Sequence, residues 1–177
     1  LHPFDDPLLW QGHASILDEA VDDGIRPDAV ILSVGGGGLL AGVDEGLRRN
    51  GLDNVPIYAV ETEGMSSYKA ALVAGKPVEV AALTGVATSL GARQVCQRAF
   101  DLTKKRTVVP VTVSDREAVD ACLTFLDDHR MLVEPACGAS LAPLYGKKLD
   151  LSNYKNVLVI VCGGSTATVK SLSIFKV

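Results

Sequence analysis

The stretch "SVGGGGLLAG", residues 33–42, places four consecutive glycines between an apolar run and a helical pattern. Glycine adopts positive φ and has no Cβ, so several backbone amides can converge on one anion. The start of a helix adds roughly half a positive charge. The spacing predicts a phosphate site formed by the amides of Gly35, Gly36, Gly37, Gly38 and Leu39. The alternative is a tight strand-to-helix turn that packs closely and binds no ligand.

The same glycines also fit a relaxed dinucleotide fingerprint. Gly36-x-Gly38-x-x-Ala41 is followed by Glu61, 20 residues after Ala41, where an acidic group would bind a ribose hydroxyl. A nicotinamide-binding half-domain is therefore a rival interpretation. A Walker motif is excluded, because no Gly-Lys-Ser/Thr follows the glycines.

A second glycine element, "VLVIVCGGST" at residues 157–166, repeats the strand-then-glycine pattern. Ligands of open α/β sheets bind outside the carboxyl ends of the strands, so both glycine loops are expected to face one pocket. Cys162 would lie in that pocket. By composition alone, a buried cysteine inside the strand is the favoured alternative.

Four apolar runs rich in β-branched residues are predicted strands that position these loops. The segments between the strands have helical patterns. The strands are predicted over 29–34, 56–61, 107–113 and 157–162, and helices over 8–23, 39–50, 66–75, 92–105, 114–127, from 135 onward, and after a cap at Ser165. Pro110 assigns the third strand to a sheet edge or a bulge. The alternation predicts an α/β fold: a mainly parallel open sheet with helices on both faces.

Composition excludes several classes of function. A length of 177 residues suits one domain, and a net charge of −4 argues against a nucleic-acid partner. No apolar stretch is long enough for a membrane span. The scattered cysteines (Cys96, Cys122, Cys137, Cys162) lack zinc or disulfide spacing, which favours a reducing, cytoplasmic location.

Together, "SVGGGGLLAG", "HPFDDP", "VEPACGAS" and "VIVCGGS" resemble the L-serine dehydratase (serine ammonia-lyase) and threonine deaminase family. These are pyridoxal-phosphate enzymes of the tryptophan-synthase β-type fold (fold type II). The resemblance covers nearly the whole chain. It implies deamination of L-serine to pyruvate and ammonia by β-elimination of water, and of L-threonine to 2-oxobutanoate.

The resemblance also implies roles for single residues. Residues 35–39 would bind the cofactor phosphate, and the neutral thiol of Cys162 would lie beside the pyridine nitrogen. A monovalent cation, expected to be potassium, would be held by the Glu61 carboxylate. Backbone carbonyls would complete its shell, from Gly35, Met65, Leu90 and Ala92. The alternative for Glu61 is a strand-end carboxylate in a surface salt bridge.

One departure from the family pattern is large. The Schiff-base lysine of the family, and the loop that binds the substrate carboxylate, match nothing in this chain. Residues 1–177 are therefore expected to be the C-terminal part of the large, cofactor-binding domain, with the lysine in an N-terminal half of the same enzyme. The catalytic base is not expected in this chain, and the assembled enzyme is expected to be a homodimer acting on a small amino acid.

Three alternatives stay open at this point. Serine racemase and a threonine-specific deaminase share the resemblance. A cofactor-binding or regulatory homologue without catalysis, and the nicotinamide module, belong to other classes of function.

Overall fold

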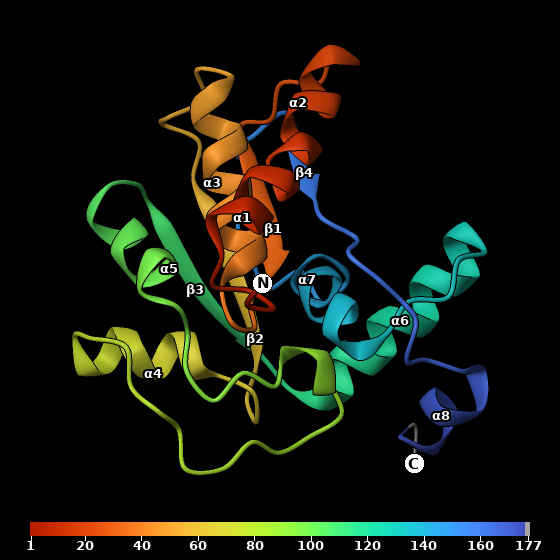
Figure 1. Cartoon of the computed structure of the whole chain (residues 1–177). Coiled ribbons are helices and arrows are strands. Elements are labelled where there is room, and N and C mark those ends of the chain that lie inside the picture. The colour runs from red at the N-terminus through yellow and green to blue at the C-terminus, as the bar shows by residue number, and fades with distance from the viewer. Residues whose placement is uncertain (176–177) are drawn as a thin grey trace.

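The computed structural model describes residues 1–175 and contains a four-stranded sheet with helices on both faces (Figure 1). The strands lie in the order β3-β2-β1-β4, and each neighbouring pair is parallel. Their bounds are Ala29–Ser33 (β1), Ile57–Thr62 (β2), Val108–Val113 (β3) and Val157–Val159 (β4). The predicted fold class is confirmed, and Pro110 lies in an edge strand as expected.

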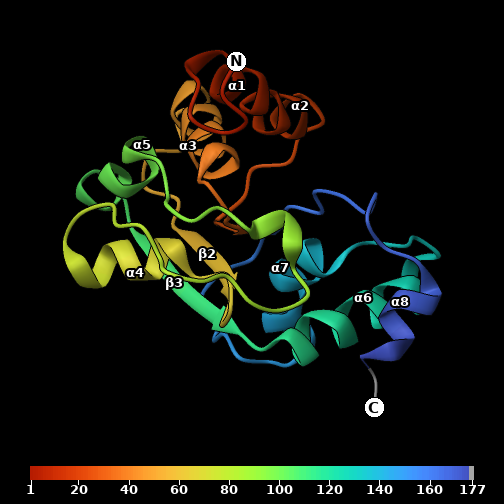
Figure 2. The ribbon, with the colours of Figure 1, turned by 60° about the horizontal axis from the view of Figure 1, so that its bottom comes forward.

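Two apolar clusters, one on each face of the sheet, explain why the strands read as continuous hydrophobic runs. On β1, Ala29 and Ile31 pack toward α6 and α7, whereas Val30 and Leu32 pack toward α2 to α5. The helices are α1 (Pro7–His13), α2 (Ser15–Asp22), α3 (Gly38–Arg49), α4 (Ser67–Ala74), α5 (Gln97–Asp101), α6 (Asp115–His129), α7 (Pro135–Tyr145) and α8 (Val169–Ile174), with 3-10 turns η1 (Thr88–Leu90) and η2 (Leu102–Lys104). Figure 2 shows α6 packed beside α7 and α8 beside α6.

Some helix bounds differ from the sequence-based expectation. The helix expected over 8–23 is divided at Ala14 into α1 and α2. The helix expected over 92–105 begins only at Gln97, because the Cys96 amide donates to the Gly36 carbonyl (2.9 Å) and holds this segment against the glycine turn. The last helix is capped by Thr168, which forms a reciprocal capping box with Ser171, and not by Ser165.

The order of the strands creates a crevice at one edge of the sheet. The chain runs from β1 outward through β2 to β3, and then crosses back to add β4 on the other side of β1. The connections that follow β1 and β4 therefore diverge at their carboxyl ends. This topological switch point is where open α/β sheets bind ligands.

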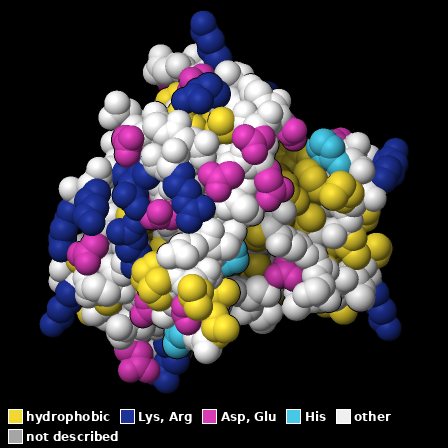
Figure 3. All heavy atoms as spheres, turned by 45° about the horizontal axis from the view of Figure 1, so that its top comes forward, with side chains coloured by type: hydrophobic (Ala, Val, Ile, Leu, Met, Phe, Trp, Pro, Cys, Tyr) yellow, Lys and Arg dark blue, Asp and Glu magenta, His cyan; other side chains and the backbone are white. Residues whose placement is uncertain are grey.

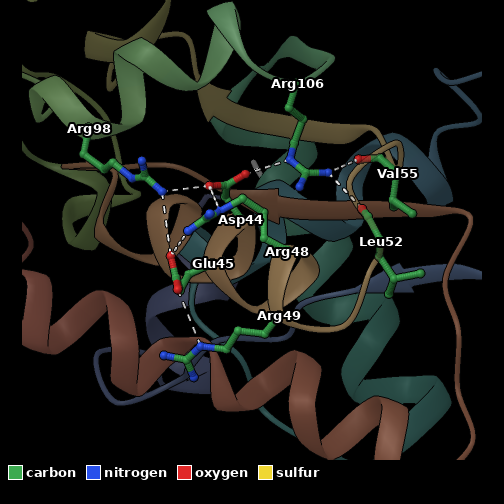
Figure 4. A network of polar contacts seen from close by, with 8 residues as sticks. All are labelled: Asp44, Glu45, Arg48, Arg49, Leu52, Val55, Arg98 and Arg106. Carbon is green, nitrogen blue, oxygen red and sulfur yellow. Dashed lines mark hydrogen bonds and ion pairs between the residues drawn. The ribbon is translucent and has the colours of Figure 1, made fainter.

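A buried ion pair anchors helix α3, which begins at the glycine turn (Figure 4). Asp44 accepts from Arg106 Nε (2.8 Å), and both side chains are 3% exposed. Arg98 donates to the same carboxylate (3.0 Å). Arg106 also donates to the carbonyls of Leu52 and Val55, so one guanidinium joins α3, the loop before β2 and the residues before β3.

The surface carries mixed charge. On the face drawn in Figure 3, Lys and Arg side chains gather on one side and lie among acidic side chains. Arg48 and Arg49, for example, both pair with Glu45. Over the described part of the chain, every helix is too short or too polar to cross a bilayer.

Replacing Asp44 by Asn is expected to destabilise the fold strongly, because the Arg106 guanidinium then stays buried without its counter-charge. Breaking one partner of a buried pair costs about 3–5 kcal/mol in the free energy of unfolding. The matched control is Asp120→Asn, which removes the exposed ion pair with Arg116 and should change stability by less than about 1 kcal/mol. Urea denaturation of both variants measures the difference; equal losses would show that the buried network does not anchor α3.

Candidate active site

A cavity of about 370 Å³ lies at the switch point and is lined by both glycine loops. All the predicted cofactor contacts line it, namely Gly35, Gly36, Gly37, Gly38, Leu39 and Cys162. Two segments more than 120 residues apart in the sequence thus meet in one pocket. The loop after β1 provides one wall and the loop after β4 the other.

The four glycines are small for different steric reasons. A Cβ on Gly36 would lie 2.2 Å from Cγ of the Phe4 ring, and one on Gly38 would lie 2.7 Å from the Phe4 carbonyl oxygen. Gly37 has φ +93° and faces the opposite side, where a Cβ would lie 2.5 Å from Cβ of Ala99. Gly35 faces the backbone of Leu90, 3.0 Å from its Cα. Packing within the chain therefore accounts for all four residues, so their number alone is not a sign of a ligand.

The free amides of the turn are the stronger sign of an anion site. Helix α3 has Gly37 at its N-cap and no side-chain cap. Within residues 1–175, no acceptor contacts the amides of residues 35–39. The Gly36 carbonyl accepts from Cys96, and a trans peptide directs its N–H to the opposite side, so the Gly37 amide points away from Cys96. These donors, together with the helix dipole, suit a phosphate.

Cys162 lies in the loop beyond β4 and not inside the strand. Pairing of β4 with β1 ends at Val159, because the chain then turns to follow the segment before α7, where Glu134 N donates to the Gly163 carbonyl. Cys162 is exposed, whereas Cys96, Cys122 and Cys137 are buried. The buried strand cysteine that composition favoured is wrong for Cys162, and the thiol faces the cavity.

Two neighbours change the acidity of the Cys162 thiol. A hydrogen bond from Cys137 lowers the pKa of Cys162 below its usual range, against the opposing effect of partial desolvation, and Ser33 contributes in the same direction as Cys137. The Ser33 Oγ to Cys162 Sγ distance is 3.6 Å. Donation to Cys162 and burial raise the pKa of Cys137. These neighbours make the Cys162 thiol more acidic than an isolated cysteine, and the neutral thiol implied by the resemblance stays a prediction.

Glu61, at the carboxyl end of β2, is buried with 1% of its surface exposed. Its two carboxylate oxygens accept from the amides of Tyr68 and Lys69 (2.8 Å each), at the start of α4. Burial raises the pKa of Glu61 to about 7, although these two amides and the Lys69 charge act in the opposite direction. The surface salt bridge considered for Glu61 is therefore not found among the described residues.

This position of Glu61 also weakens the nicotinamide alternative. Glu61 does not line the cavity beside the glycine turn, and both of its oxygens are already bonded to α4. An acidic group that binds a ribose hydroxyl would have to face the same pocket as the glycines.

Most of the backbone carbonyls predicted to bind a cation have no hydrogen-bond donor among residues 1–175. Met65 follows the same strand end and forms an isolated bridge with Thr62. The Leu90 backbone contacts Gly35, and Ala92 lies just beyond η1. In the part of the chain that the structure describes, no donor reaches the carbonyls of Gly35, Met65 and Ala92, whereas the Leu90 carbonyl accepts from the Ala92 amide. Carboxylate and carbonyl oxygens are the ligand types that hard cations bind.

The sequence-based prediction did not single out several cavity residues, among them Phe4, His13, Ser89 and Glu134. Phe4 and Glu134 belong to the motifs "HPFDDP" and "VEPACGAS", which were the available signals. Glu134 Oε2 accepts from Thr166 N (3.1 Å) and Thr166 Oγ1 (2.9 Å). Burial acts against ionisation of Glu134, but hydrogen bonds from Ser89 and Thr166 outweigh it and lower its pKa.

Comparison with known proteins gives consistent matches. The family model described as "Pyridoxal-phosphate dependent enzyme" matches residues 1–163. The chain is 44% identical to an L-serine dehydratase of Dictyostelium discoideum, covering 98% of this chain and 52% of that protein. It is 49% identical to a serine dehydratase-like protein of Mus musculus, covering 99% and 56%.

Among solved structures, a fungal L-serine ammonia-lyase from Rhizomucor miehei superimposes with a TM-score of 0.94 at 37% identity. That match covers 99% of this chain and 58% of the fungal one. The chain thus spans about half the length of the relatives it matches.

Alkylation by iodoacetamide is expected to modify Cys162 first, because it combines exposure with a lowered pKa. In cofactor-free protein, the midpoint of its pH–rate profile should lie below the usual cysteine range, because the pKa of Cys162 is lowered. Cys137→Ala removes the thiol donor and should move that midpoint upward, toward the usual cysteine range. Peptide mass mapping across a pH series follows each cysteine. An unchanged midpoint in Cys137→Ala would show that Cys137 does not acidify Cys162.

Proposed function

Because the chain belongs to the pyridoxal-phosphate dependent enzymes, we propose that it is the C-terminal part of a large cofactor-binding domain in an ammonia-lyase. Completed by an N-terminal half that carries the Schiff-base lysine, it deaminates L-serine to pyruvate and ammonia. L-Threonine, which gives 2-oxobutanoate, is the second substrate. The names of the similar dehydratases and of the fungal ammonia-lyase support this choice.

The observation that carries the proposal is the shared cavity of the glycine turn and Cys162. The uncapped amides of residues 35–39 fit a phosphate, and the Cys162 thiol on the other wall fits a ring nitrogen. When bound, pyridoxal phosphate supplies an electron sink that acidifies the α-proton of an amino acid and lets the β-hydroxyl leave. The residues of this chain bind and orient the cofactor. Within residues 1–175, no lysine lines the cavity, so we assign proton transfer to the Schiff-base lysine of the N-terminal half.

The thiol suits elimination better than transamination. A cysteine stabilises a protonated ring nitrogen less than an aspartate would, so the electron sink is weaker. In the structure, contacts with Ser33 and Cys137 hold the Cys162 sulfur just beyond the carboxyl end of β4. The position of Cys162 on the wall opposite the glycine turn, and not only its acidity, suits it to contact the ring nitrogen.

We further propose that a monovalent cation, with potassium preferred, binds at Glu61 and the carbonyls of Gly35, Met65, Leu90 and Ala92. A cation would offset the burial of the Glu61 carboxylate. It would also join the backbone of Gly35, at the phosphate turn, to the end of β2. The assembled enzyme is proposed to be a cytoplasmic homodimer; the four cysteines are all free, which agrees with a reducing compartment.

The activity is tested on the complete protein with pyridoxal phosphate and L-serine. We expect visible absorbance from the bound cofactor, a spectral change on addition of serine, and pyruvate release followed in a coupled assay. Chiral analysis of the mixture separates the alternatives: formation of D-serine would indicate a racemase, and turnover of threonine alone a threonine-specific deaminase. Cofactor binding without any product would indicate a homologue without catalysis.

The cation site is tested by potassium titration of Glu61→Gln. Loss of a ligand charge should weaken the apparent affinity for potassium at least about tenfold, measured from activity and from the thermal shift on adding salt. Glu63→Gln is the matched control, because Glu63 is an exposed carboxylate two residues away. If both variants respond to potassium like the parent protein, Glu61 does not bind the cation.

A further inference from the structure

We propose that Phe4 is a positioning residue that holds the glycine turn in its phosphate-binding conformation, and that Gly36 and Gly38 are small in order to admit it. The inference rests on the proposed cofactor site and adds a residue outside the phosphate-binding loop itself. Phe4 comes from the N-terminal segment, which precedes the turn by some 30 residues in the sequence.

The turn is held between two surfaces. On one side, the Phe4 ring covers Gly36, and the Phe4 backbone lies against Gly38, where a Cβ would be 2.7 Å from its oxygen and 3.0 Å from its Cα. On the other side, Val95 and Ala99 contact Gly37. The third side is the cavity. A turn with no side chains of its own has few ways to resist rotation of its peptides, so these flanking groups must restrict it.

Phe4 is itself fixed in place. The Trp10 indole N–H donates to the Phe4 carbonyl (2.8 Å), which ties the segment to α1. The His2 ring packs edge-on against the Phe4 ring, with centroids 4.6 Å apart. Contacts of α1 with α3 extend this support to the helix that the turn begins. Phe4 therefore forms part of a rigid backing and is not a freely moving side chain.

The consequence for binding concerns the phosphate alone. If Phe4 keeps the amides of residues 36–38 convergent, its loss lets them diverge and weakens charge-assisted hydrogen bonds to the anion. In the proposed site, the pyridine nitrogen lies beside Cys162, which is on the other wall of the cavity and not on this turn. A ligand that lacks the phosphate should therefore be nearly indifferent to Phe4.

The test compares pyridoxal phosphate with pyridoxal on the complete protein, by equilibrium binding followed by absorbance. Phe4→Ala should weaken binding of pyridoxal phosphate about tenfold or more, as expected for the loss of one charged hydrogen bond, and change that of pyridoxal less than about twofold. Phe4→Leu, which keeps apolar contact, should have an intermediate effect and replaces Phe4→Ala if that variant does not fold. Leu8→Ala, at an exposed side chain of α1, is the control and should leave both affinities unchanged.

A double-mutant cycle with Gly36→Ala makes the test specific. Gly36 does not have positive φ, so the methyl group is excluded by the Phe4 ring and not by backbone strain. Gly36→Ala should weaken binding of pyridoxal phosphate in the parent protein, and have little further effect in Phe4→Ala, where the space is open.

Equal losses for the two ligands, or an equal cost of Gly36→Ala in both backgrounds, would overturn the inference while leaving the cofactor site in place. A parent protein that binds neither ligand would overturn the proposed function, and this inference with it.

Discussion

Helix α3 begins with no side chain to satisfy its first amides, and the architecture around the cavity depends on this. Its N-cap is a glycine, and the residues before it are glycines too, so within residues 1–175 the amides of 35–39 have no protein acceptor. Uncapped amides at a helix start carry partial positive charge, and a buried helix end without partners is costly unless water or a ligand supplies acceptors. A phosphate satisfies several of these amides together.

For such a turn to bind well, everything behind it must be rigid. The Asp44–Arg106 pair fixes the middle of α3 to the neighbouring loops, so the helix cannot slide away from the sheet. The Cys96 amide holds the Gly36 carbonyl, and Phe4 covers the opposite surface. These contacts come from three separate parts of the chain. The short glycine turn therefore depends on segments that are far apart in the sequence.

Glu61 shows how the same sheet edge combines stability with chemistry. Its carboxylate takes the place of a cap for α4, yet burial makes its charge expensive, as the raised pKa indicates. A bound cation would compensate for this cost. Glu134, which lines the cavity, holds the Cys162 loop by accepting from the amide and the hydroxyl of Thr166.

The amino-acid sequence by itself determined the fold class and the elements that carry the site. Apolar runs at 29–34 and 56–61 can be stable only if covered on both faces, and Ser114, Glu117 and Pro135 mark helix starts through local hydrogen bonds and fixed φ. Helix caps and fixed φ angles depend only on residues that are close in the sequence, so the sequence alone predicts them. The glycine turn and Cys162 could be placed at strand ends for the same reason.

Only the tertiary structure determined which distant segments of the chain contact one another. That Phe4 packs on Gly36, that β4 ends before Cys162 and that Glu61 caps α4 all depend on contacts between segments distant in sequence. No local propensity encodes such distances. The four glycines illustrate the difference: the sequence indicated an exceptional turn, but only the packing showed which neighbour excludes each side chain.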